Sequence, residues 1–257
     1  MAGQAVIDSY MDSKGVRLKV NLDEPDIIIR VDVIQNETYV GLDTTGDDAL
    51  HKRWYRVYQH PAPLNTAIAS AMIRLARWKP DKILFDPMCG GGTIPIEAAL
   101  MAKGIPIGKN REFAFFKIFG RTEPVYREKR VDMEIYGMEK FKKHVLGAIK
   151  NAEEAGVSDV IKFFRGDATS LKLDFMPEVV ITNPPYGLRI GSKKIIERLY
   201  DGFLNSLRNN MEKGIIVVIT AEYDVLREKA LFYGYEIKEE IDVRYGNLNT
   251  KIFNMMY

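Results

Sequence analysis

Four consecutive residues, Asn183-Pro184-Pro185-Tyr186, follow an apolar run and carry the most specific chemistry in the chain. The side-chain oxygen of Asn183 and the carbonyl oxygen of Pro184 can each accept a hydrogen from a planar exocyclic amine, which draws the nitrogen lone pair toward an electrophile. The prolines stiffen the turn, and the ring of Tyr186 offers a flat surface on which the acceptor group can stack. The tetrapeptide therefore predicts in-line methyl transfer to an amine, with Asn183, Pro184 and Tyr186 as the catalytic residues.

A glycine loop lies earlier in the chain, in the string Asp86-Pro-Met-Cys-Gly-Gly-Gly-Thr93. Its glycines allow backbone amides to approach a ligand closely, and the helix N-terminus after Thr93 suits a carboxylate. The acid that precedes the loop would repel a pyrophosphate but would attract a cation, which disfavours a nicotinamide-dependent dehydrogenase. S-adenosylmethionine carries an ammonium and a sulfonium. We therefore predict S-adenosylmethionine as the cofactor, bound by Asp86, Pro87, Cys89, Gly90, Gly92 and Thr93.

Two further acids end later strands of the predicted sheet. Glu139 offers two oxygens to the two hydroxyls of a ribose, and Asp167, followed by Ala168, can accept from the amino group of adenine. Asn65 and Thr66 precede the first long helix, where they either contact the methionine end of the cofactor or cap the helix.

Short apolar runs alternate with helical periodicity from residue 64 onward. Strands are expected at residues 82–85, 134–137, 161–164, 179–182, 214–220, 236–243 and 251–255. Helices are expected at residues 64–78, 93–102, 141–155, 193–209 and 225–232. This alternation predicts an α/β fold with a parallel sheet covered by helices on both faces. The last two strands have no helix between them, so we expect them to pair antiparallel.

The first fifty residues have a different pattern. The alternating pattern of residues 26–34 and 38–42 predicts a β-hairpin with one solvent-exposed face, and polar residues 43–48 follow. Two strands are too few to fold alone in water. We place a domain boundary near residue 50, which gives domains 1–50 and 51–257.

A basic and aromatic insertion separates the first two strand-helix pairs. Residues 103–130 hold eight Lys and Arg against three Glu, with Phe113, Phe115, Phe116, Phe119 and Tyr126 between them. We expect the aromatic side chains to be mostly core and the basic ones to be available to RNA. The polar loop at residues 244–251 either reaches the site or closes a turn.

Composition limits the remaining possibilities. The chain has 257 residues, 46% of them hydrophobic, which suffices for a full core. No apolar run approaches membrane-span length and no hydrophobic signal core is present, so a cytoplasmic location is expected. A single cysteine and three scattered histidines make a metal site improbable. We interpret Cys89 as a small loop residue, and His51, His60 and His144 as surface or boundary residues.

These motifs, in this order, resemble the class I S-adenosylmethionine-dependent methyltransferases, and among them the THUMP-domain RNA guanine-N2 methylases. The loop from Asp86 to Thr93 together with Asn183-Pro-Pro-Tyr-Gly-Leu-Arg189 is similar to the archaeal enzymes that form N2-methylguanosine at position 6 of tRNA. The resemblance implies a Rossmann-like, seven-stranded, mostly parallel sheet with an antiparallel last strand. It also implies that residues 1–50 are the C-terminal part of a THUMP domain, most of which is missing here.

We therefore predict methyl transfer from S-adenosylmethionine to the N2 amine of a guanosine in tRNA, without a metal or a membrane. The same tetrapeptide suits adenine N6, cytosine N4 or a protein glutamine amide, and these targets remain open. An inactive RNA-binding module is the alternative from another class, against which Asp86 and Asn183 argue.

Overall fold

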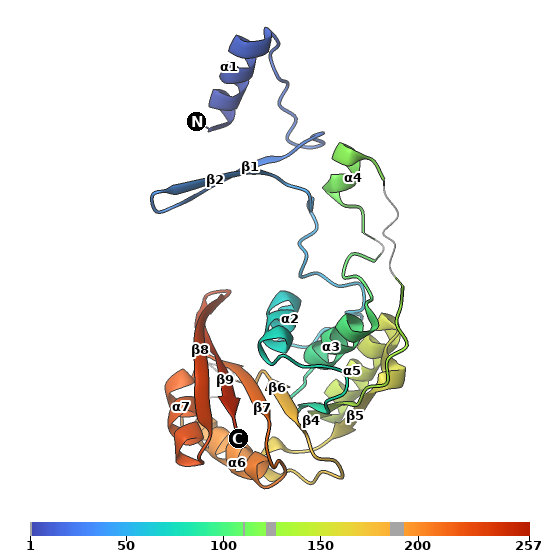
Figure 1. Ribbon diagram of the computed structural model, residues 1–257, viewed down its shortest axis with the longest axis vertical. Helices are drawn as coiled ribbons and strands as arrows, with labels where there is room; N and C mark the ends of the chain where they lie inside the picture. The colour runs from blue at the N-terminus through green and yellow to red at the C-terminus, as the bar shows by residue number, and fades with distance from the viewer. Residues whose placement is uncertain (1, 110, 122–126, 186–192) are drawn as a thin grey trace. The chain divides into compact units, whose positions relative to one another are not determined.

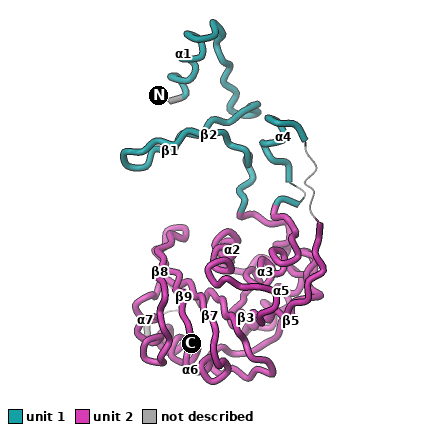
Figure 2. The backbone as a smooth tube through the Cα atoms, viewed as in Figure 1, with its two compact units in different colours: residues 1–50, 108–125 teal, residues 51–107, 126–257 magenta. Residues whose placement is uncertain are grey.

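The computed structural model describes residues 2–109, 111–121, 127–185 and 193–257 (Figure 1). The chain divides into two compact units. The smaller comprises Met1–Leu50 and Gly108–Val125, and the larger comprises His51–Ile107 and Tyr126–Tyr257 (Figure 2).

The larger unit contains a seven-stranded sheet in the order β5-β4-β3-β6-β7-β9-β8. Its strands are β3 (Leu84–Asp86), β4 (Ile135–Glu139), β5 (Ile161–Arg165), β6 (Val179–Thr182), β7 (Ile215–Thr220), β8 (Glu236–Tyr245) and β9 (Leu248–Met256). The last strand, β9, is antiparallel to both of its neighbours, whereas the pairs from β5 to β7 are parallel. The predicted α/β fold with an antiparallel last strand is confirmed.

The helices of this unit lie on both faces of the sheet. They are α2 (Thr66–Leu75), α3 (Thr93–Lys103), α5 (Lys142–Ala155), α6 (Lys193–Arg208) and α7 (Tyr223–Phe232), with short 3-10 turns η1 (Ser158–Val160) and η2 (Ala168–Ser170). Strand residues alternate between two hydrophobic clusters: Leu84 packs with α2, α3 and α5, and Phe85 packs with α6 and α7. No described helix combines the length and the apolar character that a membrane span requires.

The order of the strands fixes where a ligand can bind. From β3 the chain continues to β4 and β5 on one side of the sheet, and later to β6 and β7 on the other. The carboxyl ends of β3 and β6 therefore form a topological switch point, where sheets of this kind leave a crevice for ligands. The loop after β3 contains the three glycines, and the turn after β6 begins at Asn183.

The smaller unit holds α1 (Ala2–Lys14), β1 (Ile29–Ile34), β2 (Glu37–Leu42) and α4 (Ala114–Phe119). The hairpin pairs Ile29 with Leu42 and Ile34 with Glu37, as the alternating pattern predicted. Helix α1 was not anticipated, because its sequence has little amphipathic periodicity. Both strands of the hairpin are largely exposed.

The position of α4 corrects our interpretation of the insertion. The backbone amide of Phe115 donates to the carbonyl of Thr44 at 3.0 Å, so the segment joins the smaller unit. None of the α4 residues is buried, and Phe119 is 59% exposed. The phenylalanines contact one another, with the Phe115 and Phe119 rings 4.8 Å apart, so the expectation that they are mostly core is wrong. Tyr126 lies outside the described residues.

Candidate functional site

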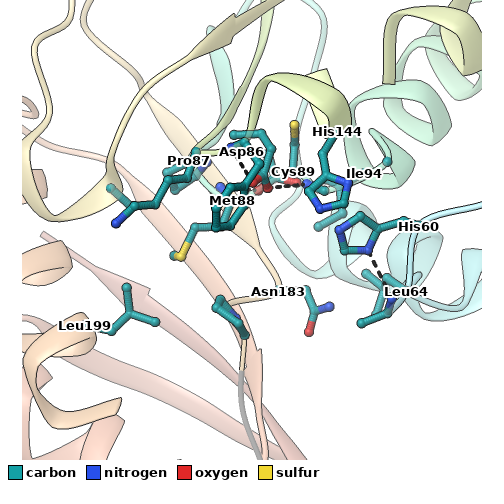
Figure 3. A pocket seen from close by; sticks show the side chains of 18 of the residues that line it. His60, Leu64, Asp86, Pro87, Met88, Cys89, Ile94, His144, Asn183 and Leu199 are labelled. Atoms are coloured by element: carbon teal, nitrogen blue, oxygen red, sulfur yellow. Dashed lines mark hydrogen bonds between the residues drawn. The ribbon is translucent and has the colours of Figure 1, made fainter. Parts of the chain in front are cut away.

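A cavity of about 560 Å³ opens at the carboxyl edge of β3, β4 and β6 in the larger unit (Figure 3). Nine of the residues predicted to form the site line it, namely Asp86, Pro87, Cys89, Gly90, Thr93, Glu139, Asp167, Ala168 and Asn183. Gly92, Asn65, Thr66 and Pro184 are not among the lining residues, and Tyr186 lies outside the described part of the chain.

Asp86 is buried at the end of β3. Its Oδ1 accepts hydrogen bonds from the hydroxyl of Thr182 at 2.8 Å and from the backbone amide of Met88 at 3.1 Å. Burial raises the pKa of Asp86 to about 7, and the negative charge of Glu139 adds to this shift, although both hydrogen bonds oppose it. Since a nearby cation favours the charged form of a carboxyl, this group is suited to binding an ammonium.

The glycine loop has two separate requirements for glycine. Gly90 lines the cavity with a φ of 54°, and a Cβ there would lie 3.3 Å from the ring of His60. Gly92 precedes α3 with a φ of 81°, and its Cβ would lie 3.0 Å from Phe163 and 3.1 Å from Ala148. Gly92 therefore allows the loop to pack against Phe163 and Ala148, whereas Gly90 allows the backbone to approach the cavity closely.

Cys89 lies between Asp86 and these glycines and is buried. Burial raises the pKa of its thiol well above the ordinary value, and the charges of Asp86 and Glu139 act in the same direction. The thiol is therefore neutral, and a neutral buried thiol is a poor nucleophile.

Two acids face the cavity from neighbouring strands. Glu139 accepts hydrogen bonds from the backbone amides of Gly90 at 3.2 Å and Phe141 at 3.1 Å, which fixes its carboxylate beside the glycine loop. Asp167 binds the ammonium of Lys140 at 2.8 Å and also accepts from the amide and hydroxyl of Thr169. The Lys140 hydrogen bond, followed by those from Thr169, lowers the pKa of Asp167 to about 2, so this carboxylate is ionised.

Asn183 presents a buried acceptor without a donor. Its Oδ1 atom has no hydrogen-bond partner among the residues that the structure describes, and the side chain lines the cavity (Figure 3). A buried carbonyl oxygen left unpaired costs about 1–3 kcal/mol, so this atom calls for a donor from a ligand or from water. The next residue, Pro184, is buried, and Pro185 lines the cavity.

Two histidines lie at the site, which our interpretation of them as surface or boundary residues did not anticipate. His60 and His144 both line the cavity, with their rings 4.3 Å apart. His144 is buried, its Nδ1 atom lies 2.5 Å from the hydroxyl of Tyr58, and burial, followed by the charge of His60, lowers its pKa. The helical spacing of His144 with buried Ala148 and Asn151 was a signal that the sequence already contained.

A segment ahead of α2 forms one wall of the cavity and is held firmly. The guanidinium of Arg53 and the hydroxyl of Tyr55 each lie 2.8 Å from the Glu97 carboxylate of α3, and all three side chains are buried. Farther along, the amide of Tyr58 donates to Asn151 of α5 at 2.8 Å. These contacts position residues 60–64, which line the cavity.

Asn65 and Thr66 end this segment with structural contacts. The side chain of Asn65 accepts from the amide of Ala67 at 2.8 Å and caps α2. The hydroxyl of Thr66 is buried and donates to the carbonyl of His51 at 2.8 Å. Of the two possibilities for Asn65 that the sequence left open, the structure shows the cap.

The seven-stranded sheet with its antiparallel last strand is that of the class I methyltransferase fold. The cavity at its switch point, the acid before the glycine loop and Asn183 after β6 agree with that class. The comparison with known families agrees. The chain belongs to the RMKL-like methyltransferase domain family, whose model matches residues 53–251. A THUMP domain model matches residues 3–43.

Named relatives and a solved structure add detail. The chain is 53% identical over all 257 residues to a tRNA (guanine(6)-N2)-methyltransferase of Archaeoglobus fulgidus, and spans 64% of that protein. It is 49% identical to the Methanocaldococcus jannaschii protein of the same name, with 98% of this chain and 69% of that protein covered. The crystal structure of SMU.472, a protein named for methyltransferase activity and complexed with SAH, matches with a TM-score of 0.77 and 27% identity, over 98% of this chain and 68% of that one.

Proposed function

We propose that this chain transfers a methyl group from S-adenosylmethionine to the exocyclic N2 amine of a guanosine in tRNA, at position 6. The observation that carries the proposal is the buried, unpartnered Oδ1 atom of Asn183, in the same cavity as Asp86, Glu139 and Asp167. An amine donor satisfies this oxygen, and guanine supplies one. The names of the two archaeal relatives support this target.

The charges and hydrogen-bonding groups of the cavity fit S-adenosylmethionine. Asp86 would receive the ammonium of the methionine part, and the loop at Gly90 would lie along it. Glu139 would hold the ribose hydroxyls, and Asp167 would accept from the adenine amino group while keeping Lys140, because a carboxylate has more than two acceptor positions. The structural relative that binds SAH supports this cofactor.

Positioning is the main contribution that the protein makes to the reaction. The cofactor supplies an electrophilic methyl group on sulfonium. Asn183, with the carbonyl of Pro184, accepts hydrogens of the amine and directs its lone pair into the cavity, while Tyr186 stacks on the base. Holding two reactants in the right orientation can lower the activation barrier by about 7–11 kcal/mol relative to the same reactants free in solution. The guanosine must first leave its base stack, which costs a few kcal/mol.

The two parts of the chain divide the task. We assign RNA binding to domain 1–50, in line with the THUMP match at residues 3–43, and catalysis to domain 51–257. Basic residues of the 103–130 insertion would add phosphate contacts. As an enzyme of tRNA modification, the protein would act in the cytoplasm.

The decisive experiment incubates the chain with unmodified tRNA and labelled S-adenosylmethionine, and then maps the modified nucleoside by mass spectrometry. We expect N2-methylguanosine at position 6. Label on adenine, cytosine or a protein glutamine would replace the proposed target by one of the alternatives. Cofactor binding without transfer to any of these acceptors would support an RNA-binding module instead.

A matched variant tests the role of Asn183. We expect Asn183→Ala to abolish transfer while cofactor affinity, measured by calorimetry, stays within a few-fold of the wild-type value. Full activity in that variant would remove Asn183 from the mechanism.

A further inference from the structure

One wall of the cavity comes from α6 and has no part in the cofactor contacts proposed above. This wall, the α6 rim, consists of Ile195, Arg198 and Leu199. Residues three and four positions apart share one face of a helix, so the three side chains form a continuous strip. Core residues of α6, such as Ile196, Tyr200 and Phe203, are buried in the hydrophobic cluster under the sheet. Leu199 also packs against that cluster, whereas Ile195 and Arg198 are exposed at the cavity.

Arg198 is an exposed cation in this strip. Its guanidinium forms no hydrogen bond or ion pair with any residue that the structure describes. The acid one turn farther along the helix, Asp201, is paired with Lys229 at 3.2 Å. Beside Arg198, Ile195 leaves 48% of its surface exposed. An arginine and an isoleucine left open at a cavity wall suggest a ligand with both an anionic and an apolar part.

The charged residues that line the cavity come from different elements. Lys140 and Arg198 are the Lys and Arg residues among the described lining residues, and Lys140 is neutralised by Asp167 at 2.8 Å. The acids Asp86 and Glu139 end β3 and β4, and Asp167 follows β5, whereas Arg198 lies on α6, the helix that follows β6. In Figure 3, Leu199 of the rim and Asn183 lie on the lower side of the cavity, and Asp86 and Cys89 lie on the upper side.

We propose that Arg198 binds a phosphate of the RNA strand next to the target guanosine, and that Ile195 packs against the adjoining sugar or base. This inference rests on the proposed function, because it assumes that a nucleotide amine reaches Asn183. A nucleotide whose base enters the cavity leaves its phosphates at the wall, where a planar guanidinium forms two parallel hydrogen bonds with a phosphate.

The test measures RNA binding by the full chain with SAH present, using fluorescently labelled, unmodified tRNA and salt from 50 to 200 mM. We expect Arg198→Gln to weaken RNA affinity roughly tenfold, the amount that one charge-assisted hydrogen-bonded contact supports. The slope of log affinity against log salt should fall by about one, because one phosphate contact is lost. Arg198→Lys should retain most of the salt slope and only part of the affinity.

The matched control is Arg208→Gln, which removes an exposed arginine from the last turn of the same helix, away from the cavity. We expect this control to leave both RNA affinity and salt slope unchanged, and both variants to bind SAH as the wild type does. An unchanged salt slope in Arg198→Gln, a loss of SAH affinity there, or no RNA binding by the wild-type chain would overturn the inference. If Arg198 contributes to RNA binding but no guanosine is methylated, the proposed function fails and the phosphate contact stands.

Discussion

The hydroxyl of Thr182, the last residue of β6, donates a 2.8 Å hydrogen bond to Oδ1 of Asp86, the last residue of β3. This bond links the two strands that form the switch point, and it joins the residue before Asn183 to the acid before the glycine loop. The bond also favours the ionised form of Asp86, in opposition to burial, which raises its pKa. The turn that we propose to bind the amine and the acid that we propose to bind the cofactor are thus coupled through one buried contact.

Replacing Thr182 by valine should weaken cofactor binding at neutral pH. Valine keeps the shape of threonine but cannot donate a hydrogen bond, so the pKa of Asp86 should rise further and a smaller fraction of the carboxyl should be ionised. We expect calorimetry to show a several-fold loss of affinity for S-adenosylmethionine at pH 7, which diminishes at pH 8.5. Thr220→Val, which alters a buried threonine bonded to Tyr200 at the end of β7, should have no such pH-dependent effect. Equal losses at both pH values would argue against the coupling.

Cofactor affinity should depend on pH through Asp86 even in the wild-type protein. The pKa of this carboxyl is about 7 in the folded chain, against 3.8 as its ordinary value. Below pH 7 the bound ammonium must displace a proton, so we expect affinity to rise with pH up to about 7 and then to level off. Asp86→Asn should bind weakly, with little change over this range. A wild-type affinity that is constant between pH 5.5 and 7.5 would contradict this prediction.

The same shift predicts the opposite trend for the stability of the cofactor-free chain. Between about pH 4 and pH 7 the folded state holds the Asp86 proton and the unfolded state does not, so folding binds a proton. The contribution of Asp86 is therefore fully present below pH 4 and is lost as the pH rises through 7. Urea titrations of the wild type and of Asp86→Asn, compared across this range, isolate that contribution.

Much of this architecture could be predicted from the sequence because local pattern and fold agree there. The strand at Val179–Thr182 has the predicted ends, and the helix ending at Ala155 is followed by Gly156 in the left-handed conformation that its C-cap role requires. Nine predicted site residues share one cavity because parallel strands bring their carboxyl ends to one edge.

What the sequence did not predict depends on tertiary packing. The segment ahead of α2 lacks periodic structure, so nothing local indicated that His60 would meet His144 of α5. The aromatic insertion has the spacing of a core helix, but it joins the smaller unit through backbone bonds near Thr44. Sequence spacing did not single out Arg198, because its proposed role depends on its place at the cavity wall, which only the fold shows.

The buried ion pair that anchors the cavity wall should matter strongly for stability. The Glu97 carboxylate accepts hydrogen bonds from Arg53, Tyr55 and Ser70, so Glu97→Gln removes the negative charge that these buried groups surround. We expect a loss of about 3–5 kcal/mol in the free energy of unfolding, measured by urea denaturation. Glu178→Gln, which breaks the exposed pair with Lys82, should cost less than about 1 kcal/mol. Similar losses in the two variants would show that the buried pair does not anchor this segment.

The β8–β9 hairpin should support the cavity from the far edge of the sheet. The hydroxyl of Tyr245 donates to the carbonyl of Pro63 at 2.5 Å, and Pro63 lines the cavity. Without that bond the wall at residues 60–64 gains freedom, so Tyr245→Phe should raise the KM for S-adenosylmethionine several-fold and leave kcat nearly unchanged.

The control is Tyr235→Phe, which removes a buried hydroxyl bonded to the carbonyl of Leu204. Each of the two variants should lose about 1 kcal/mol in the free energy of unfolding. Because Tyr235 is not among the residues that line the cavity, its variant should keep the wild-type KM. A KM that rises equally in both variants would mean that general loosening, and not the contact with Pro63, affects the site.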